Sequence, residues 1–244
     1  MKYRTAGDRG SARKAVVDPA IGQVLVPAVG VSISPVPVAA GLVILLAGRP
    51  RGTSAGFLAG WLTGIALVLA AATRLGHLTE TGRAAGSALS GLALVLGLVL
   101  LALAARTWRR SVVRGSDRGP PVWITAVDSL APGRALAVGL LLAVANPKNL
   151  ALMLPAGIAL ARARLPAGEQ VLVGVTFVLV ATSTVLVPMV VHRALGPRVD
   201  PALNAARRFL TRHGTVLSVA LLLMVGIVLA AQGAGGLVTT LQMT

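Results

Sequence analysis

The chain has 244 residues, of which 55% are hydrophobic, and its formal net charge is +16. Its mean hydropathy is +0.83, and several apolar runs reach the roughly 20 residues that cross a bilayer. Because these runs show neither the polar stripe of a soluble helix nor the alternation of a strand, they predict an all-α, polytopic membrane protein.

In a soluble protein a positive charge of this size would indicate binding to nucleic acid, but in a membrane protein it has another explanation. The basic residues lie between the apolar runs, which favours topological anchoring and contact with the anionic headgroups of membrane lipids. Three Trp and one Tyr offer no stacking platform for bases, so no nucleic-acid partner is expected. The absence of cysteine excludes disulfides, Fe–S clusters and thiol relays.

In chain order, residues 1–18 are polar and basic and predict a disordered tail. The apolar run that follows is too long for a signal-peptide core, so we expect it to remain as a membrane span. A C-terminal tail is expected at 237–244. Six spans are predicted, at 21–47, 54–73, 85–105, 134–161, 170–191 and 214–236.

A basic linker at 106–133, rich in glycine and proline, divides the chain into two repeats of three spans, 19–105 and 134–236. An odd number of spans in each repeat inverts the second repeat relative to the first. Each repeat opens with a helix that is broken by proline and small polar residues, and such pairs mark the midplane site of transporters. The predicted substrate-binding residues are Ser32, Ser34, Pro35 and Pro37 in the first break and Asn146, Pro147, Lys148 and Asn149 in the second.

Lys148 is the most informative of these residues, because a charge at bilayer depth costs about 2.5–3.5 kcal/mol. No Asp or Glu lies inside an apolar segment to neutralise it, so a ligand or exposed carbonyls must do so. Pro147 frees a carbonyl one turn earlier, and the two asparagines beside it can bond to freed groups. The pattern predicts a polar pocket for an anionic substrate. In the alternative, the asparagines repair a kink, Lys148 extends towards the interface, and the serines bond only to their own helix.

Loops 48–53, 106–134 and 192–213 are expected on one side of the membrane, and they hold most of the arginines between spans. The positive-inside rule places this side in the cytoplasm. The protein is then expected in the plasma membrane, with both termini on its outer side.

Three histidines, His77, His192 and His213, fall in separate predicted loops without a carboxylate or second histidine at ligand spacing. We therefore expect no metal site and no cofactor. Neither a nucleophile elbow nor a P-loop is present, so the sequence predicts a protein that is not an enzyme.

Glycines recur at every fourth position of the second span, at Gly56, Gly60 and Gly64. They share one helix face and predict the close approach of a neighbouring backbone. Trp61, beside them, is expected to pack in the core rather than to line the pocket.

Three elements together resemble the GAP family of actinobacterial membrane proteins, also called sulfolipid-1-addressing proteins, within the LysE superfamily of exporters. They are Ser34-Pro35-Val36-Pro37, the Gly56-Phe57 and Gly60-Trp61 pairs, and Asn146-Pro147-Lys148-Asn149-Leu150. The resemblance covers residues 20–236. It implies a six-helix fold of two three-helix repeats and the export or surface delivery of a small or lipidic solute.

Two functions are consistent with the sequence. The first is an exporter that moves a glycolipid or another anionic amphipathic solute by alternating access. The second is a membrane scaffold that recruits lipid-synthesis or envelope proteins through its basic linker. The expected partners are the solute and membrane lipids, with a second copy of the chain or the envelope-lipid machinery as further candidates.

Overall fold

The computed structural model describes residues 22–47, 51–78, 83–114 and 131–242, and in these ranges every element is helical. This confirms the predicted all-α class for the described part of the chain. The predicted tail at 1–18 lies outside the described residues, as does the linker from 115 to 130. The elements are the helix Gly22–Ser32, α2 (Pro35–Leu46), α3 (Arg51–Leu78), α4 (Arg83–Arg114), α6 (Pro132–Val144), α7 (Pro147–Arg162), α8 (Ala167–Leu195), the 3₁₀ turn η1 (Gly196–Val199) and α9 (Asp200–Gln242).

Both predicted helix breaks are present. The axis bends by 52° between Gly22–Ser32 and α2, and by 66° between α6 and α7. A proline opens the helix after each break, Pro35 in α2 and Pro147 in α7. Proline is suited to the first turn of a helix, where its missing N–H costs nothing, but it cannot continue the helix before it. The sequence therefore places each bend.

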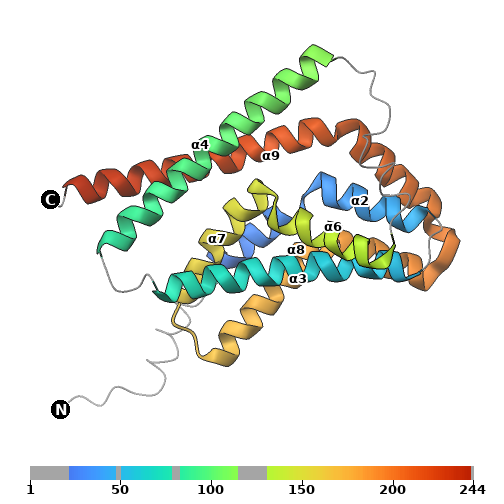
Figure 1. The fold of residues 1–244 in the computed structure, drawn as a ribbon, viewed down its shortest axis with the longest axis horizontal. Coiled ribbons are helices and arrows are strands. Elements are labelled where there is room, and N and C mark those ends of the chain that lie inside the picture. The colour runs from blue at the N-terminus through green and yellow to red at the C-terminus, as the bar shows by residue number, and fades with distance from the viewer. Residues whose placement is uncertain (1–21, 48–50, 79–82, 115–130, 243–244) are drawn as a thin grey trace.

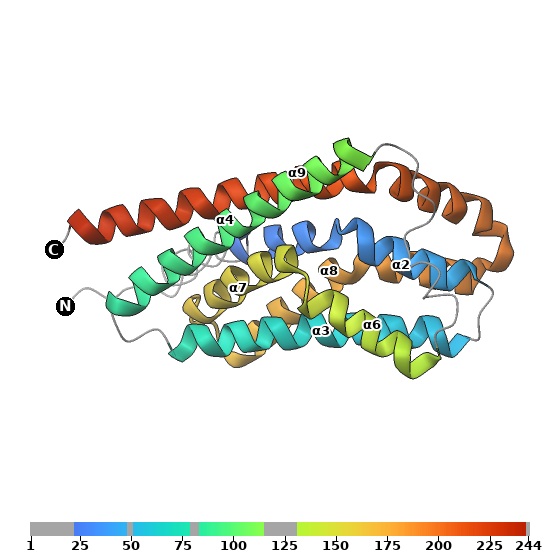
Figure 2. The ribbon, with the colours of Figure 1, turned by 45° about the horizontal axis from the view of Figure 1, so that its top comes forward.

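The helices form two groups. The two broken helices, α3 and α8 surround a core that contains Phe57, Trp61, Met153 and Phe177. The long helices α4 and α9 run beside each other along one side of this group, as both views show (Figure 1, Figure 2). A smaller cluster joins the pair to the core. It consists of Leu100 of α4, Ala151 of α7, and Val225 and Leu229 of α9.

The glycine face predicted on the second span is confirmed by the contact between α3 and α6. A Cβ atom at Gly60 would collide with the backbone of Leu136, and one at Gly64 would lie 2.5 Å from the Cβ of Ala143. The facing glycine of α6, Gly139, leaves no room for a Cβ beside the backbone of Phe57. Glycine on both helices lets the two backbones approach closely, as small residues do between membrane helices.

Four helices, α3, α4, α8 and α9, extend beyond their predicted ends. The prediction of a loop over 192–213 is wrong, because α8 continues to Leu195, η1 follows, and α9 begins at Asp200. Asp200 and Pro201 suit a helix start, and no Gly or Pro interrupts the chain from there to His213. At its other end α9 continues to Gln242, through most of the segment expected to be a tail. The first nine residues of the predicted linker belong to α4, which ends at Arg114, before the first glycine of that linker.

Three helical runs in the described ranges are long and apolar enough to cross a membrane: Gly52–Leu78, Ser90–Ser111 and Ala167–Thr239. The number is up to five if each bent pair forms one span. The third run contains α8, η1 and most of α9, and the chain turns back on itself near η1 (Figure 1). Many large apolar side chains on these helices are exposed, among them Leu67, Leu98 and Ile227. Such surfaces are stable in lipid, and the protein is a multi-pass membrane protein.

Candidate functional site

The candidate site lies where the two breaks meet. The helix Gly22–Ser32 ends with carbonyls that have no partner within the helix, as every helix does at its C-terminus. The carbonyl of Gly30 in its last turn and that of Ile33, the residue after the helix, accept hydrogen bonds from the ammonium Nζ of Lys148, at 2.8 and 3.0 Å. Lys148 belongs to the other half of the chain, so this side chain joins the two breaks.

The Lys148 side chain is buried, with 5% of its surface exposed, and it does not extend outwards along α7. Two charge-assisted hydrogen bonds contribute about 1.5–3 kcal/mol each, which offsets part of the cost of burying an ammonium. The partial negative charge at the end of Gly22–Ser32 stabilises the ammonium further. Of the two partners expected for this cation, a ligand or backbone carbonyls, the structure shows the carbonyls.

The ammonium is not saturated. It carries three N–H groups, and the two carbonyls engage two of them. In the described part of the chain no acceptor is present for the third.

The two asparagines of the second break do different things. Asn146 caps α7, because its side-chain Oδ1 accepts a hydrogen bond from the backbone N–H of Lys148 at 3.1 Å. Asn149 is completely buried and accepts a hydrogen bond from the hydroxyl of Ser34 at 3.3 Å. Its Nδ2 amide group finds no partner among the described residues. Asn146 therefore repairs the break, and Asn149, the next residue after Lys148, keeps an amide donor without a partner.

The four residues predicted from the first break are all buried, but only one of them bonds to a residue of the second break. Ser34 bonds to Asn149, as described above. Ser32 donates its hydroxyl to the carbonyl of Val29 in its own helix, at 2.8 Å. Pro35 and Pro37 lie in the first turn of α2, where they shape the break without offering a donor.

The prediction missed Thr184 of α8. Its hydroxyl donates to the carbonyl of Ser32 at 2.6 Å, so a third helix helps to cap the first break. The run Thr182-Ser183-Thr184 inside an apolar span was a usable signal, since such hydroxyls often bond freed carbonyls. Thr182 and Ser183 bond to their own helix instead.

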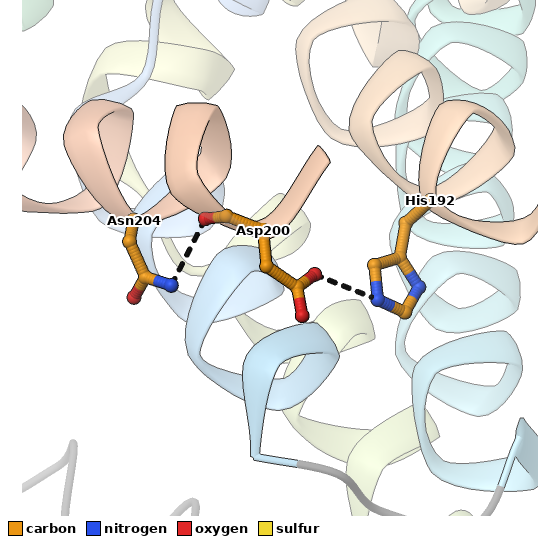
Figure 3. A network of polar contacts seen from close by, with 3 residues as sticks. All are labelled: His192, Asp200 and Asn204. Carbon is orange, nitrogen blue, oxygen red and sulfur yellow. Dashed lines mark hydrogen bonds and ion pairs between the residues drawn. The ribbon is translucent and has the colours of Figure 1, made fainter. Parts of the chain in front are cut away.

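Away from this site, α8 and α9 approach each other at His192 Nε2 and Asp200 Oδ1, which lie 3.1 Å apart and form an ion pair when the histidine is protonated (Figure 3). Asn204 donates to the carbonyl of Asp200 at 2.9 Å in the same network. The spacing of these two residues in the sequence does not indicate this contact, which forms because the turn η1 brings Asp200 back to His192. His77 and His213, also expected in loops, lie in α3 and α9. Among the described residues no three His, Cys, Asp or Glu side chains gather as metal ligands do.

The junction of the two breaks is therefore rich in donors. It contains one ammonium with a free N–H, one amide group without a partner, and the N-terminal end of α7. These groups suit an anion such as a carboxylate, a phosphate or a sulfate.

A family model described as "Sap, sulfolipid-1-addressing protein" matches residues 24–235. The match includes both breaks, the glycine face of α3 and nearly all of α9. None of the curated proteins and none of the solved structures matches the chain. The chain therefore belongs to the sulfolipid-1-addressing protein family.

Proposed function

We propose that this protein is a membrane exporter, not an enzyme, and that it moves an anionic amphipathic solute such as a glycolipid. The observation that carries the proposal is the buried ammonium of Lys148, which holds two carbonyls of the other half and keeps one N–H unused. A buried charge with spare capacity is costly unless a ligand uses it. The family description supports the same class, since a sulfolipid is an anionic lipid.

The position of the free donors supports an anionic headgroup as the ligand. Asn149 lies in the first turn of α7, and its Nδ2 group has no partner in the described structure. Broken helices in transporters direct their N-terminal ends at anionic groups of the substrate. A headgroup bound here would accept from Lys148 and Asn149 and would replace the missing acceptor.

We propose further that the chain forms six spans arranged as two inverted repeats of three, with α8 and α9 as separate spans. The bent pair Gly22–Ser32 and α2 opens one repeat, and the bent pair α6 and α7 opens the other. The third helix of the first repeat, α4, packs on the last helix of the second, α9, as two counterpart elements would (Figure 2). In this arrangement both termini face outwards from the plasma membrane.

Alternating access then follows from movement at the junction. Three contacts tie the halves there: Lys148 to Gly30 and Ile33, Asn149 to Ser34, and Thr184 to Ser32. Rocking one repeat against the other must loosen these contacts. A bound headgroup competes with the carbonyls for the ammonium, so substrate binding lowers the cost of that movement.

Replacing Lys148 by methionine tests this proposal, because methionine keeps the length of the side chain and removes its charge. The matched control is Arg162→Met, which removes an exposed cation from the other end of α7. Cells that carry each variant are compared for anionic and glycosylated lipids in their outer envelope and for the amount of protein in the membrane. We expect export to fall to the level of the deletion with Lys148→Met and to stay normal with Arg162→Met.

The scaffold function predicts the opposite pattern. If Lys148→Met kept full export while charge reversal of the arginines in 106–118 abolished it, recruitment of partner proteins would replace transport as the function.

A further inference from the structure

The C-terminal end of α6 has no cap of the kind that the first break has. The N–H of Ala145 bonds to the carbonyl of Leu141 at 2.7 Å, and this is the last bond that continues the helix. Pro147 has no N–H to continue the series. In the described ranges no hydrogen bond reaches the carbonyls of Leu142, Ala143, Val144 and Ala145.

The first break shows which ligand such a helix end takes in this protein. Alignment of Ser34-Pro35 with Asn146-Pro147 gives each break residue a counterpart. Leu142 and Ala145 then correspond to Gly30 and Ile33, whose carbonyls hold the ammonium of Lys148. The counterpart of Lys148 itself is Val36, which has no donor. One helix end thus has a cation built into the chain, and the equivalent end has none.

The free carbonyls of α6 cannot face lipid, because an unpaired carbonyl in hydrocarbon costs several kcal/mol. Val144 is 38% exposed, and Ala145 is exposed as well, so the helix end is not covered by other parts of the described structure. Water or a ligand must therefore reach it. A helix C-terminus carries about half a negative charge, and oxygen atoms are the ligands that hard cations prefer.

We propose that the C-terminal end of α6 binds a small alkali cation, Na⁺ or K⁺, through the carbonyl oxygens of Leu142 and Ala145. The cation occupies the place that the Lys148 ammonium occupies at the other break. It binds beside the anion site, since α7 begins directly after α6, and this supplies a cation to couple to transport. The coupling, but not the cation site, rests on the proposed export function.

The sequence offers a reporter for this site and a matched one for the first break. Ala145–Asn146 is the single Ala–Asn step in the chain, and Ile33–Ser34 is the single Ile–Ser step. Labelling alanine with ¹³C at the carbonyl and asparagine with ¹⁵N therefore isolates the Ala145 carbonyl by NMR. Labelling isoleucine and serine in the same way isolates the carbonyl of Ile33.

The experiment titrates the full chain in nanodiscs with NaCl or KCl, and with choline chloride at equal ionic strength as the control. We expect a saturable shift of the Ala145 carbonyl with Na⁺ or K⁺ and none with choline. The Ile33 carbonyl should not respond in the wild type, because Lys148 already occupies it. In Lys148→Met it should respond as Ala145 does, since that variant frees the first helix end.

An Ala145 carbonyl that responds identically to all three salts would overturn the proposal. If Lys148→Met did not fold, the comparison of Ala145 with Ile33 in the wild type would still test the proposal. Only the carbonyl resonance of Ala145 should shift with Na⁺ or K⁺. No lipid substrate enters this measurement. A negative result here would leave the export test unaffected, and loss of the export proposal would leave the cation site unaffected.

Discussion

The ammonium of Lys148 donates to the carbonyl of Ile33 across 3.0 Å, although 115 residues separate them in the chain. Lys148 follows the proline of one broken helix, and Ile33 precedes the proline of the other. The contact therefore joins the C-terminal end of one half-helix to the N-terminal end of another. Any movement of one half against the other acts directly on this bond, and the predictions below follow from its surroundings.

Asn149→Asp should abolish export while the protein remains in the membrane. The substitution keeps the shape of the side chain, but it replaces the free amide donor by a carboxylate next to Lys148. That carboxylate would accept from the third N–H of the ammonium and repel an anionic headgroup. Export and protein abundance are measured together, with Asn204→Asp as the control in α9. Full export by Asn149→Asp would rule out an anion site at this position.

Thr184→Val should lower the free energy of unfolding by about 1 kcal/mol, because it removes the hydrogen bond to the carbonyl of Ser32. Thr176→Val on the same helix is the control. The hydroxyl of Thr176 bonds only to Leu172 within α8, so its loss should change stability by less. Denaturation of both variants in detergent measures the difference. Equal effects would show that the contact between Thr184 and Ser32 adds nothing to stability.

Gly60→Ala should destabilise the protein by about 1–3 kcal/mol, since overpacking forces the neighbouring backbone to move. The added Cβ would collide with the carbonyl oxygen of Leu136, and backbone yields less readily than a side chain. Gly91→Ala in α4 is the control, because a Cβ there would meet nothing within 4 Å. We expect Gly91→Ala to leave the melting temperature unchanged or to raise it. A neutral Gly60→Ala would contradict the close contact between α3 and α6.

Asp200→Asn should have a small effect, below about 1 kcal/mol, on the free energy of unfolding. The ion pair with His192 is partly exposed, and such pairs contribute little. Export should not change, because the pair lies in the turn between α8 and α9, outside the junction of the two breaks (Figure 3). The same export assay and denaturation experiment measure both quantities. A large loss of export would show that this turn takes part in transport.

The sequence by itself determined the helical class, the two breaks and the glycine face of α3, because each depends on local chemistry. Pro35 and Pro147 end the preceding helices wherever those helices pack, and glycines spaced by four residues share a face in any helix. The start of α9 at Asp200 was also within reach of sequence reasoning. The prediction of a loop there rested on its place between two apolar runs, whereas the absence of Gly and Pro from residue 202 to His213 favours a helix.

Only the tertiary structure decided what neutralises Lys148. The sequence showed that no carboxylate lies in the apolar segments, but it could not choose between a ligand and carbonyls as the partner of Lys148. It also could not single out the carbonyls of Gly30 and Ile33 among the many in the chain. Backbone carbonyls are the same at every residue, so no sequence pattern marks the two that accept from a distant lysine. The same holds for Thr184, which shares its hydroxyl chemistry with Thr182 and differs only in the helix face it occupies.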